Sequence, residues 1–231
     1  MKRLPFYFLF VLLIALISSG ELQAQKLTVG LRAGTSVFKV HNEDINSKTK
    51  FTSGLAFAVP IDIQLNKRFS LQPEIAFVQK GVRFENHWET DVRTTDVKTN
   101  YLEIPVLFKA NFGKNRLKGH VFLGPSFGYA TNRYTVKQIG DADKKINGVS
   151  FIDGPGAKSK RFEMNVVGGV GASFQCGPGS ILLDARYSLG LTDNTKFKGE
   201  KPGVWSKTTN RGMTFSLGYS VPLSFMPWAH R

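Results

Sequence analysis

Apolar and polar residues alternate most clearly in the stretch from Asn100 to Thr131. In its first half, one face carries only apolar side chains: Leu102, Ile104, Val106, Phe108, Ala110 and Phe112. After a turn at 113–117, a second run repeats the alternation. Successive side chains of a strand point to opposite faces, so the pattern predicts two strands joined as a hairpin. Each run has about 12 residues, the length that a tilted strand needs to cross a bilayer.

Eight such runs follow the first 26 residues, at 27–37, 51–65, 69–84, 100–112, 118–131, 162–175, 181–191 and 213–225. Their connections alternate in length: those at 66–68, 113–117 and 176–180 are short, whereas those near 38–50, 85–99, 132–161 and 192–212 are long and polar. Outer-membrane barrels combine an even strand number with short periplasmic turns and long external loops. The pattern therefore predicts an all-β fold, an eight-stranded antiparallel up-and-down transmembrane β-barrel with both ends in the periplasm.

A soluble eight-stranded barrel of the lipocalin kind fits the same period. Its apolar face would be inside, and charges such as Glu74 and Glu103 would then lie outside. Soluble strands are usually nearer five or six residues, and a soluble barrel has no reason to separate short from long connections. Strand length, loop segregation and the leader favour the membrane barrel.

The first 24 residues resemble a secretory signal. Lys2 and Arg3 precede an apolar core at 4–17, and Ala24 offers a cleavage site. An uncleaved membrane anchor is the alternative, but the apolar core is shorter than the roughly 20 residues of a spanning helix. We expect a cleaved signal peptide, and an outer-membrane β-barrel domain over 25–231.

Charged residues recur on the face opposite the apolar one, which is the lumen face of the predicted barrel. Seven form the predicted structural network: Arg32, Glu74, Glu103, Lys109, Glu163, Asp184 and Arg186. Asp62 and Lys80 share their parity. Side chains just fill an eight-stranded barrel, and an isolated buried ion is costly, so these charges should pair and plug the lumen. We expect the partners on neighbouring strands, because Glu103 and Lys109 lie about 20 Å apart on one strand. A proton or small-ion path is the alternative.

Aromatic residues of the apolar face recur beside the short turns and the last terminus. They are Phe69, Phe112, Phe174 and Phe225. Barrels place aromatic girdles at both membrane interfaces, so these four are the predicted periplasmic girdle.

The segment Tyr101–Lys109, YLEIPVLFK, together with Leu71–Phe77 and Gly168–Gly171, resembles the PorT-like outer-membrane β-barrel family. The similarity runs from about Lys26 to Phe225. It implies a small eight-stranded barrel in the outer membrane. The founding member is associated with protein export through an outer-membrane secretion machinery, so the resemblance implies an accessory role there, with components of that machinery as partners. It carries over no catalytic residues.

Two other functions remain open. His41 and His87 fall in predicted external loops, where a lipid-modifying enzyme would need them beside a nucleophile. The chain has no HExxH or GxSxG pattern, and we expect no catalytic residues, no cofactor and no metal site. Trp88 and Trp205 lie in predicted external loops and could anchor a ligand or partner.

The net charge of +14 does not point to nucleic acid, because no basic cluster is interleaved with aromatic residues. Five basic residues lie on or beside two predicted periplasmic turns: Lys67, Arg68, Lys114, Arg116 and Lys118. Others, in the longest loop, could face lipopolysaccharide phosphates. We expect a monomer in contact with outer-membrane lipid and lipopolysaccharide.

Overall fold

The computed structural model describes residues 27–42, 49–85, 92–113, 116–139, 142–147, 153–154, 157–192, 195–197 and 208–225. The predicted signal peptide lies outside these ranges. Within them, no helix has the length and apolar character needed to cross a membrane.

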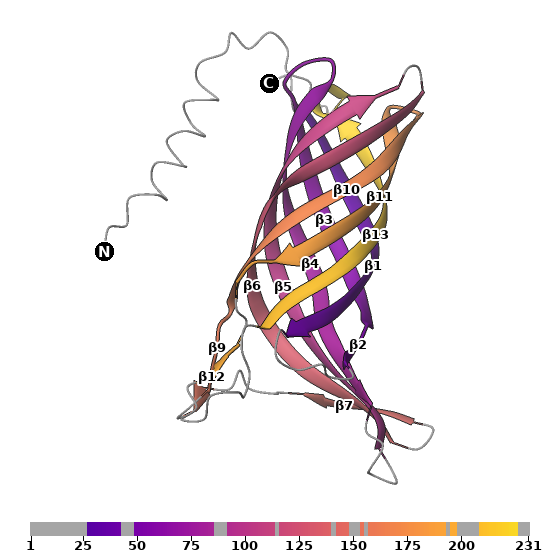
Figure 1. Cartoon of the computed structure of the whole chain (residues 1–231). Helices are drawn as coiled ribbons and strands as arrows, with labels where there is room; N and C mark the ends of the chain where they lie inside the picture. The colour runs from indigo at the N-terminus through magenta and orange to yellow at the C-terminus, as the bar shows by residue number, and fades with distance from the viewer. Residues whose placement is uncertain are drawn as a thin grey trace, which may run out of the picture.

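Eight long antiparallel strands form a closed barrel (Figure 1). They are β1 (Leu27–Asn42), β3 (Thr52–Gln64), β4 (Phe69–Glu85), β5 (Val92–Phe112), β6 (Leu117–Ile139), β10 (Phe162–Cys176), β11 (Gly179–Gly190) and β13 (Thr208–Pro222). β13 pairs with β1 and β6 pairs with β10, so the sheet has no free edge along the barrel wall. The predicted eight-stranded antiparallel barrel is confirmed.

Five short strands and one 3-10 turn complete the described structure. β2 (Thr49–Lys50) pairs with β4, β7 (Ala142–Asn147) pairs with β6, and β8 (Asp153–Gly154), β9 (Ala157–Ser159) and β12 (Thr195–Phe197) form a separate small sheet. The 3-10 turn η1 (Leu223–Phe225) follows β13.

Phe225 was predicted to end the last strand, and this is wrong. The ladder with β1 ends at the pair between Thr28 and Pro222, because β1 itself begins only at Leu27. Within the described part of the chain, residues 223–225 have no strand partner and form η1.

The two faces of the wall differ in the direction expected for a membrane protein. Leu31 on the outer face is 69% exposed, and large apolar side chains continue around the barrel, whereas Glu163 on the inner face is 0% exposed. An outward apolar band around a polar interior suits a bilayer and not water. The soluble barrel, which needs the opposite arrangement, is excluded.

Three tight turns lie at one end of the barrel, where β1 begins and β13 ends (Figure 1). Gly113 and Gly177 in two of these turns have φ values of 110° and 62°, a region that residues with a Cβ rarely adopt. We call this the turn end and the opposite one the loop end. Outer-membrane barrels place their short turns in the periplasm.

β5 and β6 are longer than the sequence pattern predicted. Residues 92–99 and 132–139 were assigned to loops, yet they continue both strands, and β7 pairs alongside (Figure 1). A register shift at Asn100 and Tyr101 marks the place where the barrel wall passes into this extension. We call residues 81–85, 92–99 and 132–139, with β2 and β7, the projecting sheet.

The projecting sheet lies beyond the apolar band, whose last exposed members are Leu102 on β5 and Tyr129 on β6. Arg83 ties β4 to β5 here, because its Nε and Nη2 donate to the carboxylate of Asp96 at 2.6 and 2.8 Å. Burial raises the pKa of Asp96, but the hydrogen bonds and charge of Arg83 outweigh it and hold that pKa below its ordinary value. The ion pair between Arg83 and Asp96 could not be predicted from the alternation of apolar and polar residues.

Candidate functional site: the charged lumen

All seven residues of the predicted network lie on barrel strands and point into the lumen. β1 supplies Arg32, β4 supplies Glu74, β5 supplies Glu103 and Lys109, β10 supplies Glu163, and β11 supplies Asp184 and Arg186. Their period-two spacing puts them on the face opposite the lipid-facing side chains. They divide into two clusters and one pair, stacked from the loop end to the turn end.

The arginine cluster occupies the middle of the lumen and comprises Arg32, Glu74, Asp184, Arg186 and His120. Arg186 binds Glu74 through two parallel contacts of 2.8 and 2.9 Å. Arg32 contacts Glu74 at 2.5 Å and also donates to Asp184. Nε2 of His120 lies 2.7 Å from Oδ1 of Asp184. Glu74 and Asp184 therefore each contact at least two nitrogen-bearing side chains. These contacts offset the free-energy cost of burying the two carboxylates.

Space for the His120 and Asp184 contact depends on Gly171 of β10. A Cβ at this position would lie 2.3 Å from both Oδ1 of Asp184 and Nε2 of His120. The missing side chain thus makes room for a polar contact between β6 and β11.

The lysine cluster lies nearer the loop end and comprises Lys80, Glu103, Glu163, Ser126 and Asn210. Nζ of Lys80 lies 2.7 Å from Glu103 and 3.1 Å from Glu163. Ser126 donates to Glu103 at 3.0 Å, and Asn210 donates to Glu163 at 3.1 Å. One buried ammonium thus holds two buried carboxylates, so its loss would leave both without a cation in this cluster.

Aromatic rings enclose the same ammonium. Nζ of Lys80 lies 4.9 Å from the ring centroid of Tyr101 and 5.2 Å from that of Phe38. Both rings are buried, so they separate the lysine cluster from solvent and add a cation–π contribution.

A pair nearer the turn end joins Lys109 to Asp62 at 2.9 Å and to Gln72 at 3.1 Å. Gln72 also donates to Glu74, which connects this pair to the arginine cluster. The expectation of partners on neighbouring strands holds for Lys80 and Glu103, but it is wrong for Lys109 and Asp62, because β3 and β5 are separated by β4. The long basic side chains reach across the narrow lumen.

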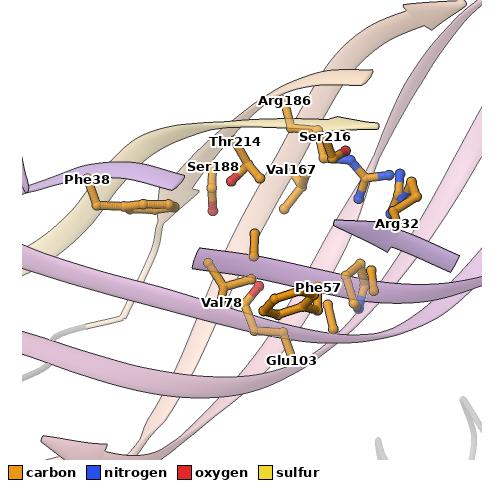
Figure 2. Close-up of a pocket in the computed structure, with 14 residues that line it drawn as sticks. Arg32, Phe38, Phe57, Val78, Glu103, Val167, Arg186, Ser188, Thr214 and Ser216 are labelled. Atoms are coloured by element: carbon orange, nitrogen blue, oxygen red, sulfur yellow. The ribbon is translucent and has the colours of Figure 1, made fainter. Parts of the chain in front are cut away.

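A cavity of only about 50 Å³ lies between the two clusters (Figure 2). Arg32 and Phe38 are at opposite sides of it. Nε of Arg32, Nε of Arg186 and Oγ of Ser188 have no hydrogen-bond partner among the described residues. A cavity of this size holds no more than a few water molecules. Among the described residues, paired charges therefore fill this middle part of the lumen.

Three of the four predicted girdle residues, Phe69, Phe112 and Phe174, are exposed on the outer face at the turn end. The ring of Phe69 stacks on Phe108 with centroids 5.4 Å apart. The side chain of Phe225 lies outside the described residues.

The candidate enzyme and binding residues are only partly described. His41 lies near the loop end of β1, whereas His87, Trp88 and Trp205 lie outside the described residues. Within the described ranges, no three His, Cys, Asp or Glu side chains are arranged to hold a metal ion.

Sequence reasoning missed two contributors to the clusters. His120 has the same parity on β6 as Ser126, so the alternation alone could have placed it in the lumen. Asn210 could not be found this way, because it falls in a segment that the pattern assigned to a loop.

Comparisons with known proteins agree with this architecture. The model of the family described as outer membrane protein beta-barrel domain matches residues 23–196. No curated protein matches the chain in sequence.

Solved structures with a similar fold include Neisserial surface protein A, at 12% identity and a TM-score of 0.42, covering 84% of this chain and 96% of that one. The attachment invasion locus protein Ail of Yersinia pestis has 13% identity and a TM-score of 0.41, covering 84% and 99%. OprG from Pseudomonas aeruginosa has 11% identity and a TM-score of 0.46, covering 86% and 97%. None of the three assigns an activity to this chain.

Proposed function

Because this chain belongs to the outer membrane protein beta-barrel domain family, we propose that it is a closed, non-enzymatic barrel with an accessory role in the outer membrane. The observation that carries the proposal is the filled lumen. Lys80 with its two carboxylates and the arginine cluster leave between them a cavity of about 50 Å³. A barrel sealed in this way acts through its surfaces, as an anchor or support for other molecules.

The position of His120 argues against its use as a catalytic base. His120 is 2% exposed and is held against Asp184 inside the lumen, away from both the lipid and the external medium. A lipid-modifying enzyme needs its base within reach of a nucleophile and of the substrate. Protein export is the more specific form of the accessory role, and it rests on the resemblance of Tyr101–Lys109 to PorT-like barrels.

The projecting sheet favours a second candidate, a barrel that binds a ligand or partner at its loop end. β5 and β6 have 21 and 23 residues, whereas β11 has 12. A bilayer requires only about 9–11 residues per strand, so the additional length lies outside the membrane, where a partner can reach it. Binding residues are commonly carried on connecting segments that a rigid scaffold positions, and the paired strands position such segments here.

A deletion strain tests the proposal, with secreted proteins and lipid A masses measured in parallel. The accessory role in export predicts fewer secreted proteins and unchanged lipid A, with full recovery when the gene is returned. Altered lipid A acylation would instead establish the enzyme. If both are unchanged, the export role fails.

A trimmed variant separates the barrel from the projecting sheet. Residues 82–97 and 133–159 are each replaced by a short Asn-Gly turn, which leaves both ion-pair clusters in place. If the loop-end binding surface is essential, the trimmed barrel assembles in the membrane but fails to restore the deletion strain. Full restoration would show that the projecting sheet is dispensable.

A further inference from the structure

The turn end of the lumen opens into a cavity of about 450 Å³ lined by residues of all eight barrel strands. We call it the basic vestibule, because its charged lining consists of Lys67, Lys109, Arg116, Lys118 and Asp62. Its volume lies in the range of about 300–1,000 Å³ that is usual for ligand pockets. The lumen network described above closes its inner end.

The vestibule carries an excess of positive charge. Its single carboxylate, Asp62, is engaged by Lys109 at 2.9 Å. Lys67, Arg116 and Lys118 are exposed, and none of them has an ion-pair partner among the described residues. Like charges around a concave, low-dielectric wall reinforce one another and attract anions.

Backbone contacts hold the turns that carry these cations. Oδ1 of Asn66 accepts hydrogen bonds from the backbone N–H groups of Arg68 and Phe69, both at 2.9 Å, which fixes the turn around Lys67. The carbonyl of Arg116 accepts from the N–H of Gln175 at 2.8 Å, which ties its turn to β10. The three cations therefore project from fixed points on the rim, so less ordering is needed when a ligand binds.

We propose that the basic vestibule binds a short acidic peptide segment of a periplasmic protein. Lys67 lies on one turn, and Arg116 and Lys118 lie on or beside another. Cations separated in this way can each bind one of several carboxylates along a peptide, whereas one compact anion could not contact them all. The side-chain amides of Gln64, Asn111 and Gln175 also line the cavity and can hydrogen-bond peptide groups between the carboxylates. This site is distinct from the loop end, and it does not depend on the accessory role.

The full-length protein in lipid nanodiscs is titrated with a fluorescent hexaglutamate peptide at low salt, and binding is followed by anisotropy. We expect saturable binding that weakens as salt is raised, because screening reduces the attraction. A variant with Lys67→Gln, Arg116→Gln and Lys118→Gln should bind about tenfold more weakly, the combined effect of three exposed ion pairs. Hexalysine should not bind.

A matched control removes three positive charges away from the turn end, with Lys137→Gln, Lys160→Gln and Arg161→Gln. None of these residues lines the vestibule. Both variants are first checked for barrel assembly by heat-dependent mobility on gels. An equal loss of affinity in both would show a nonspecific charge effect and overturn the proposal. Binding of tripolyphosphate without binding of hexaglutamate would also overturn it, because the site would then select compact phosphates.

Discussion

The lumen and the projecting sheet use the same kinds of ion pair in different surroundings. In the lumen, Lys80 and Glu163 have side chains that are each 1% exposed, and Lys80 binds a second carboxylate as well. In the projecting sheet, the side chain of Arg83 is 41% exposed while it pairs with Asp96. A buried charge cannot lose its partner without remaining as an uncompensated ion, whereas water can replace a partner at the surface. We therefore expect the lumen to tolerate substitutions less well than the exposed Arg83 side of the projecting sheet does.

The largest effect should follow from Lys80→Met, which keeps the length of the side chain but removes its charge. Glu103 and Glu163 would remain buried without their shared cation. We expect a loss of about 3–5 kcal/mol in the free energy of unfolding. Urea unfolding of the protein in lipid vesicles measures this.

Adding Glu103→Gln and Glu163→Gln to Lys80→Met removes the uncompensated charges and should recover most of the stability. A loss for Lys80→Met no greater than that for Lys160→Met, at an exposed site, would show that the lysine cluster contributes little.

A smaller effect is expected for Gly171→Ala. The new Cβ would lie 2.3 Å from atoms of His120 and Asp184, so the contact between these side chains must shift. Overpacking of this kind costs about 1–3 kcal/mol. The same unfolding assay measures it.

Gly168→Ala on the same strand is the matched control, because its Cβ would meet only a terminal carbon of Leu123 at 3.2 Å and the carbonyl oxygen of Phe122 at 3.8 Å. Equal stability of the two variants would contradict the packing described around Gly171.

The smallest effect should be confined to the projecting sheet and depend on pH. The pKa of Asp96 is lowered on folding, so its contribution to stability is complete above its unfolded pKa of about 3.9 and is lost as the pH falls through the folded value. Amide hydrogen exchange in 92–99, corrected for its intrinsic pH dependence, should show weaker protection at pH 3 than at pH 6, with the barrel wall unchanged. Asp96→Asn should abolish this difference. An identical pH response in the variant would assign the effect to another group.

The sequence was informative where one face of a strand meets lipid. The alternation at residues such as Leu102 and Ile104 predicted the strands, the charges that face the lumen and the topology. It could do so because a shift of one residue would move every apolar side chain from the lipid face to the lumen face. It failed for residues 92–99 and 132–139, where no lipid imposes an apolar face and pairing between strands decides the structure. The alternation placed Glu163 and Lys80 on the lumen face, but it could not predict that they form an ion pair. β4 and β10 are not neighbours in the sheet, and their side chains meet only across the closed barrel.

Conductance measurements show whether paired charges close the lumen. Purified protein is inserted into planar bilayers and the current is recorded under an applied voltage. We expect no large steady conductance, because the cavity between the two clusters has a volume of only about 50 Å³. Steady, porin-like current steps from the intact protein would contradict it.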